Sequence, residues 1–273
     1  MNILYIGDIV GKPGRKAVQK ILPQLRKDKN IDLVVANADN LSSTGRGASD
    51  HGLEVIMQAG VDFFTSGDHF WKHRDVVQMI DNGTYPVIRP ANYPPGALGK
   101  GWGEFDLGAA GKVVIINLMG RVFIRDLVDD PFRCIDFILQ KYPRDEYKTI
   151  LVDIHAEATS EKMALGWYLD GRVSAVVGTH THVPTADAGL LQKGTAYVSD
   201  IGMTGPFHSV LGVKTDTIIS VQMHQTPHKF EVEEEGPVDF RSIFIQTDSD
   251  GNATHIERLD QRLLPDLKTN MVM

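Results

Sequence analysis

Acidic, amide and imidazole side chains recur in this chain directly after short apolar runs. Taken singly, each has an ordinary explanation, such as a turn or a helix cap. What they share is their position, just beyond a segment with the pattern of a buried strand. The set comprises Asp8, Asp39, Asn40, Asp68, His69, His155, His180 and His182. Ligands of open α/β sheets bind beyond the carboxyl ends of the strands, so the pattern predicts that these groups converge on one site.

The chemical types in this set favour a metal centre. Carboxylates combined with imidazoles suit zinc, manganese, iron and nickel, whereas carboxylates alone suit magnesium or calcium. The set is too large for one tetrahedral zinc ion and suits two metals that share one carboxylate. His180 and His182 stand two residues apart, so in an extended segment they point the same way and can each reach a different metal.

Strands and helices alternate in the part of the chain that must position these groups. Apolar runs predict strands at 2–7, 31–36, 61–65, 112–119, 149–154 and 175–178, and helical spacing predicts helices from residue 11 and at 48–59, 130–140 and 160–169. Residues 85–102 are rich in proline and glycine and predict a long ordered loop. Segments 213–223 and 239–247 are β-rich, so we expect them to add antiparallel strands. The alternation predicts an α/β fold with parallel βαβ units.

Composition excludes several classes of protein. The chain has 273 residues, of which 42% are hydrophobic and 23% charged, which excludes disorder as the dominant state. A net charge of −7 disfavours a protein that holds nucleic acid on a basic face. The single cysteine, Cys134, excludes an internal disulfide framework and a thiolate zinc cage. We see neither an apolar run long enough to span a membrane nor a signal-peptide pattern, so we expect a cytoplasmic protein.

Several motifs resemble those of the calcineurin-like metallophosphoesterases, and more closely those of their YmdB-like branch. The motifs are Gly7-Asp-Ile-Val-Gly-Lys-Pro-Gly, Gly67-Asp-His, His155-Ala-Glu-Ala-Thr-Ser-Glu-Lys, Gly178-Thr-His-Thr-His-Val-Pro-Thr-Ala-Asp and Asp200-Ile-Gly-Met-Thr-Gly-Pro. The resemblance runs from Met1 to about Leu264. It implies an α/β fold in which a sandwich of mixed β-sheets is flanked by helices. It also implies a single metallophosphoesterase domain over residues 1–267, and we expect 268–273 to be a frayed tail.

The resemblance further implies a role for each residue of the set. One metal would be held by Asp8, Asp39, Asn40 and His182, and the other by Asp39, Asp68, His155 and His180, so that Asp39 bridges. The catalytic His69 would stand next to the scissile phosphate. The metals would be iron or manganese, with zinc as an alternative. Asp39 and Asp68 depart from the branch, which usually carries Glu and Asn there, and Asn40 would replace the histidine that many members of the superfamily carry at Val10.

The implied activity is hydrolysis of phosphodiester bonds, 2′,3′-cyclic nucleotides among them, by in-line attack of a metal-bridging hydroxide. Arg46 would reach a phosphate oxygen, or else be a solvated loop arginine. The alternatives are a metal-stabilised regulatory protein that binds a nucleotide or partner without turnover, and an RNA nuclease. An amidohydrolase is disfavoured, because its paired histidines normally come at the first strand. We expect a small phosphodiester or cyclic nucleotide as partner, no membrane and no stable nucleic-acid complex, and the sequence leaves a homo-oligomer open.

Overall fold

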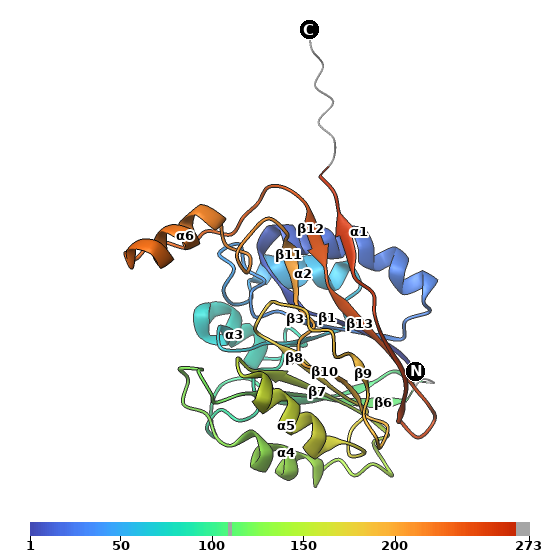
Figure 1. The fold of residues 1–273 in the computed structure, drawn as a ribbon. Coiled ribbons are helices and arrows are strands. Elements are labelled where there is room, and N and C mark those ends of the chain that lie inside the picture. The colour runs from blue at the N-terminus through green and yellow to red at the C-terminus, as the bar shows by residue number, and fades with distance from the viewer. Residues whose placement is uncertain (109–110, 266–273) are drawn as a thin grey trace.

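The first of two large sheets carries the N-terminal half of the predicted site. The structure is a computed structural model that describes residues 1–108 and 111–265 (Figure 1). The strand order of this sheet is β14 (Ala253–Arg258), β13 (Ser242–Thr247), β1 (Asn2–Ile6), β3 (Leu33–Asn37) and β4 (Phe63–Thr65). Strands β1, β3 and β4 are parallel, and helices α1 (Gly11–Asp28) and α2 (Asp50–Gln58) connect them. Strand β13 runs antiparallel to β1, so the sheet is mixed.

The second large sheet carries the C-terminal half of the site. Its order is β5 (Trp102–Asp106), β6 (Lys112–Met119), β7 (Thr149–His155), β8 (Ala175–Thr179), β10 (Ala196–Val198) and β9 (Gly189–Leu190). Strands β6, β7, β8 and β10 are parallel, and α4 (Pro131–Leu139) and α5 (Thr159–Leu169) form crossovers. Asp130 caps α4 by accepting hydrogen bonds from the backbone N–H groups of Phe132 and Arg133.

A small sheet and three short helices complete the described elements. The sheet has the order β15 (Gln261–Leu263), β12 (Val238–Phe240), β11 (Met203–Pro206) and β2 (Asp8–Ile9). The helices are the 3₁₀-helix η1 (Phe70–Lys72), α3 (Arg74–Asp81) and α6 (Thr215–His224). The predicted loop over residues 85–102 carries no helix, and its β-structure is limited to an isolated bridge between Val87 and Phe64 and the start of β5.

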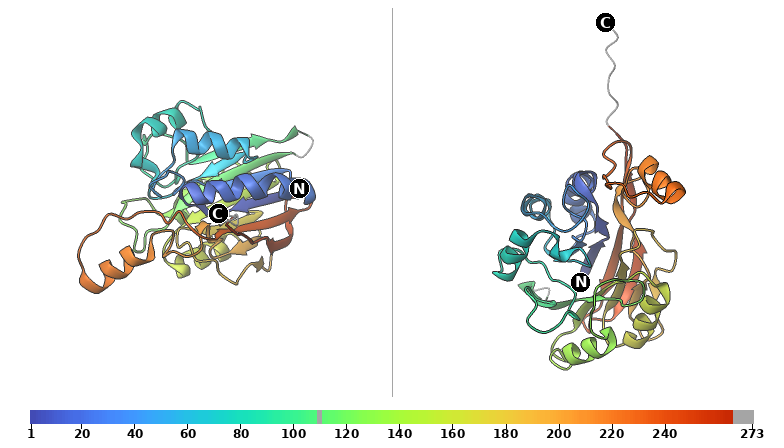
Figure 2. Two further views of the ribbon diagram at one scale, coloured as in Figure 1. Left: turned by 90° about the horizontal axis from the view of Figure 1, so that it is seen from above. Right: turned by 90° about the vertical axis from the view of Figure 1, so that its left-hand side faces the viewer.

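The two large sheets pack face to face, and helices cover their outer faces (Figure 2). Alternate residues of β1 show this: Ile3 and Tyr5 lie in the core between the sheets, whereas Leu4 and Ile6 lie in the core under α1 and α2. Strands buried on both faces need continuous apolar runs, which is the pattern in the sequence. The structure therefore confirms the predicted α/β sandwich of mixed sheets flanked by helices.

The prediction of β-structure at 213–223 is wrong. Residues Thr215–His224 form helix α6, which has no buried residue and extends away from the body of the molecule (Figure 1). Its β-branched residues, Ile218 and Ile219 among them, suggested a strand. Among the described strands none pairs with α6, and only Val213 before it forms isolated β-bridges, with Val210 and Val232. A helix satisfies the backbone hydrogen bonds of residues 215–224 within their own segment. The prediction for 239–247 is confirmed by β12 and β13.

No helix within residues 1–108 and 111–265 is long and apolar enough to cross a lipid bilayer. The expectations about location, domain bounds and the C-terminal tail are not tested by the structure. The cytoplasmic location and the single domain over residues 1–267 stay predictions. The predicted frayed tail, 268–273, lies outside the described residues.

Candidate metal centre

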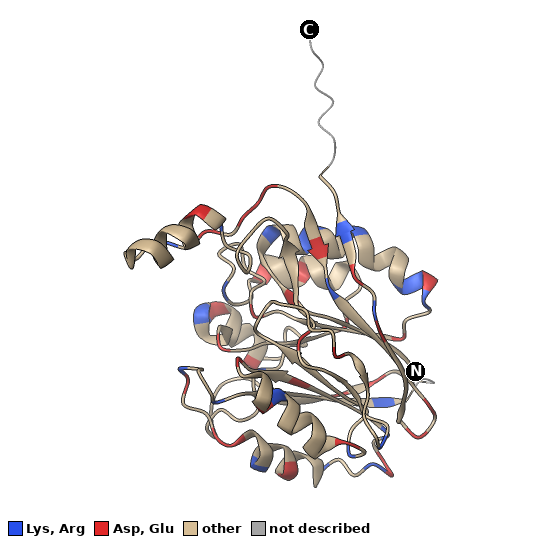
Figure 3. Cartoon of the chain, viewed as in Figure 1, with Lys and Arg blue, Asp and Glu red and all other residues tan. Residues whose placement is uncertain are grey.

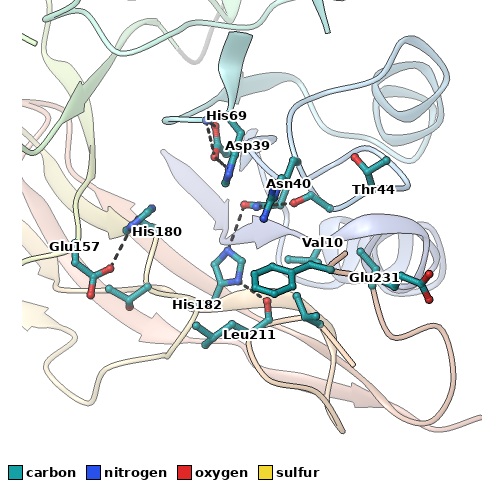
Figure 4. Close-up of a pocket in the computed structure, with 17 residues that line it drawn as sticks. Val10, Asp39, Asn40, Thr44, His69, Glu157, His180, His182, Leu211 and Glu231 are labelled. Atoms are coloured by element: carbon teal, nitrogen blue, oxygen red, sulfur yellow. Dashed lines mark hydrogen bonds and ion pairs between the residues drawn. The ribbon is translucent and has the colours of Figure 1, made fainter. Parts of the chain in front are cut away.

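The parallel strands deliver the predicted donors to one edge of the sandwich. Asp8 follows β1, the Asp39–Asn40 pair follows β3, and Asp68 and His69 follow β4. His155 ends β7, and His180 and His182 follow β8. The carboxyl ends of parallel strands meet at the same edge, so these side chains lie close together. Asp39, Asn40, His69, His180 and His182 line a cavity at this edge (Figure 4).

One group of donors consists of Asp68, His155 and His180. Their ligand atoms all lie within 4.8 Å of one another. His155 Nε2 is 3.2 Å from Asp68 Oδ1, and His180 Nδ1 is 3.1 Å from His155 Nε2. The glycine of the Gly67-Asp-His motif allows this approach, because a Cβ on Gly67 would lie 2.1 Å from His155 Nε2. The group has the donor types and spacing of a transition-metal site.

A second group consists of Asp8, Asn40 and His182. His182 Nε2 lies 3.2 Å from Asn40 Oδ1 and 3.9 Å from Asp8 Oδ1. Asp8 is fully buried, and its Oδ1 has no hydrogen-bond partner among the described residues. A buried carboxylate oxygen without a partner is costly in a protein interior, and coordination to a metal would satisfy it. The residues present therefore fit a metal here.

Asp39 lies beside the first group and is held firmly. Its Oδ1 accepts a hydrogen bond of 2.5 Å from the N–H of Gly67, and its Oδ2 lies 2.8 Å from His69 Nδ1 and 3.7 Å from His155 Nε2. Asp39, Asp68 and His69 also form a cluster in which one ligand atom from each lies within 4.8 Å of the others. His69, predicted as the catalytic residue, therefore lies close enough to Asp39 and Asp68 to share a metal with them.

The pKa values of several donors are shifted, because they are buried and because many carboxylates lie close together at this edge. Burial, together with the charges of Asp200 and Asp153, raises the pKa of Asp8 to about 8, although a charged His155 opposes the shift. Burial lowers the pKa of His182 to about 4, so this imidazole is neutral at pH 7 and able to ligate a metal. Burial alone would raise the pKa of Asp68, but hydrogen bonds from His155 and His180 hold it well below its usual range.

A buried network beneath the donors fixes the orientation of His155. His155 Nδ1 donates to Thr179 Oγ1 over 2.9 Å, and Thr179 Oγ1 donates to Asp153 Oδ1 over 2.7 Å. This chain of bonds places the Nδ1 proton away from the cavity and leaves Nε2 directed at Asp68. Sequence analysis missed Asp153, although an aspartate inside the apolar run of β7 was a visible signal.

A buried ion pair holds the loop that carries His180 and His182. Lys162 Nζ donates to Asp200 Oδ2 and to Thr179 O, each over 2.7 Å, and the Lys162 and Asp200 side chains are each 1% exposed. Asp200 Oδ2 also accepts from the N–H and the hydroxyl of Thr181, which lies between the two histidines. Asp200 follows strand β10, so the rule that found the other acids could have found it too.

The predicted extended geometry of this loop is wrong, although both histidines reach the site. The φ angles of His180 and His182 are 95° and 65°, in the left-handed region. A turn rather than an extended strand therefore separates the two imidazoles, and each joins a different donor group. The Leu211 carbonyl accepts from His182 Nδ1 over 3.1 Å, which leaves Nε2 for the centre.

Arg46 and Glu157 line the same cavity, whose volume is about 280 Å³. Arg46 is exposed, and its Cζ lies 5.6 Å from the centroid of the Phe230 ring. Glu157 Oε2 lies 3.2 Å from His180 Nε2 (Figure 4). The other ring nitrogen, Nδ1, lies 3.4 Å from Asp68 Oδ1. Glu157 and Phe230 were not singled out from the sequence.

The chain is similar in sequence to proteins named as phosphodiesterases. The chain is 43% identical over 262 residues to the 2′,3′-cyclic-nucleotide 2′-phosphodiesterase of Bacillus subtilis, covering 95% of this chain and 96% of that protein. It is 34% identical over 258 residues to a putative phosphatase/phosphodiesterase of Mycoplasma genitalium, covering 92% and 89%.

Solved structures show the same fold over nearly the whole chain. A hypothetical protein from Thermus thermophilus superposes with a TM-score of 0.89 at 40% identity, covering 97% of this chain and all of that one. A phosphatase from Mycoplasma pneumoniae superposes with a TM-score of 0.88 at 31% identity, covering 96% and 93%. The family described as YmdB-like protein matches residues 4–259, which confirms the resemblance predicted from the motifs. The chain belongs to the YmdB-like family.

Proposed function

We propose that this protein is a metal-dependent phosphodiesterase that hydrolyses 2′,3′-cyclic nucleotides. The observation that carries the proposal is that the strand-end donors gather at one edge, beside a cavity, in two groups that each combine carboxylate or amide oxygens with imidazoles. The substrate class is that named for the Bacillus subtilis relative.

In this proposal Asp8, Asn40 and His182 hold one metal, Asp68, His155 and His180 hold the other, and Asp39 is shared. Iron or manganese fits this donor set, and zinc is the alternative. When bound, two such ions supply a nucleophile at neutral pH and neutralise charge on the phosphate. In the net reaction, a water oxygen bonds to phosphorus, one ester P–O bond of the cyclic phosphate breaks, and the freed sugar oxygen takes up a proton.

His69 is the residue proposed to handle that proton. Its Nδ1 is engaged by Asp39 Oδ2, so Nε2 is the nitrogen available to a leaving oxygen. Burial disfavours the charged form of His69, but the hydrogen bond to Asp39 and the charges of Asp39 and Asp68 outweigh burial and raise its pKa. Arg46, which also lines the cavity, is proposed to meet a phosphate oxygen or the nucleoside.

The assay compares metal-loaded wild-type protein with Asp39→Ala on 2′,3′-cyclic AMP, bis-p-nitrophenyl phosphate and a single-stranded RNA. The proposal predicts turnover of the cyclic nucleotide by wild-type protein only. Full metal occupancy with no turnover of any substrate would favour the regulatory alternative, and turnover of RNA alone would favour the nuclease. Figure 3 gives the nuclease little support, since Lys and Arg alternate with Asp and Glu over the described elements.

Metal identity needs its own measurement. Anomalous scattering at the iron and manganese edges, together with metal analysis of the purified protein, gives the occupancy of both sites. Two metals per chain, each located at one donor group, is the expected result. The size of the particle in solution, measured by light scattering, tests the homo-oligomer that the sequence left open.

A further inference from the structure

One wall of the cavity is formed by a segment that leaves the body of the molecule and returns to it. None of its residues has a role in the proposed hydrolysis. We call residues 207–235 the rim segment: it leaves after β11, runs out through α6 and returns before β12. Figures 1 and 2 show α6 standing clear of the two large sheets. The two limbs pair close to the cavity, where Lys214 N donates to Glu231 O over 3.1 Å and Glu233 N donates to Gly212 O over 3.0 Å.

The base of the rim segment is fixed to the site even though its far end is exposed. Val232 is buried against Gly11 and Gly45, and a Cβ on Gly45 would lie 2.7 Å from Val232 Cγ2. Leu211 O accepts the hydrogen bond from His182, one of the proposed metal ligands. The wall that the segment presents to the cavity is therefore held in a defined position.

This wall is mostly apolar, in contrast to the donor groups, and Glu231 is its one acidic residue among those that line the cavity. Leu211, Val213, Phe230 and Val232 line the cavity together with the donors. A phosphate group gains nothing from apolar neighbours, so the wall suits another part of the same substrate. The ring of Phe230, with the Arg46 guanidinium 5.6 Å from its centroid, offers flat surfaces of the kind on which nucleobases stack.

We propose that Phe230, with Arg46 beside it, forms the surface that stacks the base of a nucleotide while its phosphate lies at the metal centre. The proposal rests on the proposed phosphodiesterase function and adds a specificity-determining residue to it. The base would lie against the rim segment, and the cyclic phosphate would face Asp39 and His69 across the cavity.

Charge indicates a mononucleotide rather than a polynucleotide. Four glutamates follow Phe230, at positions 231, 233, 234 and 235, with Lys214 and Lys229 as the basic residues lining the same outer surface. Glu231 is paired with Lys214 and Glu234 with Lys12, over 3.1 and 3.5 Å. The remaining negative charge of Glu233 and Glu235 would repel the flanking phosphates of a nucleic-acid strand. A cavity of about 280 Å³ also suits one small ligand.

The test uses two substrates that share the five-membered cyclic phosphodiester and differ in the base. These are 2′,3′-cyclic AMP and glycerol 1,2-cyclic phosphate, assayed with metal-loaded wild-type protein and Phe230→Ala. Loss of the stacking surface should raise KM for the nucleotide about tenfold, with kcat within about twofold. Neither constant should change for the glycerol compound.

Matched variants separate stacking from folding. Phe230→Tyr keeps an aromatic face and should keep the wild-type KM, whereas Phe230→Leu keeps apolar bulk without a ring and should behave like Phe230→Ala. Ile219→Ala, on the same excursion but outside the cavity, should match wild type. Equal changes in KM for both substrates, or an unchanged KM for the nucleotide in Phe230→Ala, would overturn the proposal.

Failure of the proposed function gives a different signature. If wild-type protein hydrolyses neither cyclic compound, the phosphodiesterase assignment fails, and the wall is then tested by calorimetric binding of 3′-AMP and glycerol 2-phosphate. Weaker binding of 3′-AMP alone in Phe230→Ala supports the stacking surface. Equal affinity of wild type and variant for 3′-AMP rejects it.

Discussion

Beneath the metal donors, Asp153, Lys162 and Asp200 are almost completely buried, whereas α6 in the rim segment has no buried residue. We call the first region the floor, made of Thr65, Asp153, Lys162, Thr179 and Asp200. Each floor residue makes hydrogen bonds to segments far away in the chain, and their bonding network sets the positions of His155 and the 180–182 loop. The rim segment contacts the body mainly at its base.

This difference in burial between the floor and the rim segment separates two properties of the site, the binding of metal and the binding of what lies beside it. Floor residues hydrogen-bond to His155 and to the 180–182 loop, so in the proposed metal site this region should govern whether metal binds. Side chains in the outer part of the rim segment can be replaced with little effect on the donors. This region is therefore suited to govern what is bound beside the metal. The predictions that follow test that division, from the largest expected effect to the smallest.

Asp39→Ala should abolish turnover and reduce metal content, because the proposal makes this carboxylate a ligand of both metals. Asp39 also accepts the Gly67 N–H, so the Gly67-Asp-His turn should loosen. Metal analysis of the purified variant, alongside the cyclic nucleotide assay, checks the prediction. Two metals per chain in the variant would contradict the shared role of Asp39.

His69→Ala should lose turnover by about 10²–10⁴-fold while it keeps its metal, since one acid–base group commonly contributes that much. The measurement pairs kcat with metal content. Loss of metal would instead make His69 a ligand, in line with its proximity to Asp39 and Asp68.

Lys162→Met should destabilise the floor by about 3–5 kcal/mol, because Asp200 would be left buried without its cation. Metal affinity should fall too, since Asp200 and Lys162 hold the loop that carries His180 and His182. Denaturant unfolding and metal titration measure the two effects.

The control for that variant is the double change Lys162→Met with Asp200→Asn, which removes both charges. It should recover much of the stability while the metal affinity stays reduced, because the loop has lost its ionic anchor. A stability for Lys162→Met close to that of wild type would show that the floor does not depend on this pair.

Ile219→Ser and Met223→Ser on α6 should change the free energy of unfolding by no more than about 0.5 kcal/mol, since these side chains are 51% and 71% exposed. Metal content should stay at the wild-type value. The same unfolding and metal measurements apply, and a loss of metal in either variant would show that rim and floor are coupled.

Much of the fold was predictable because its signals are local. An apolar run of strand length and the Asp130 cap before α4 are each contained within a few residues of chain. The βαβ alternation follows from the order of such segments along the chain. The same holds for the metal donors, whose position after a strand is visible in the chain itself. The prediction for segment 213–223 was wrong because its β-branched composition is typical of a strand. Whether another strand lies beside it to pair with depends on the tertiary structure.

The sequence by itself therefore determined the sheet framework and the edge at which the proposed donors gather. Only the tertiary structure decided how the donors divide into groups and which nitrogen of each histidine faces the centre. His155 is oriented by Thr179 and His182 by the Leu211 carbonyl, partners that are 24 and 29 residues away in the chain. The choice of ring nitrogen is set by the hydrogen bond that the other nitrogen makes, and such partners exist only once distant segments have packed together.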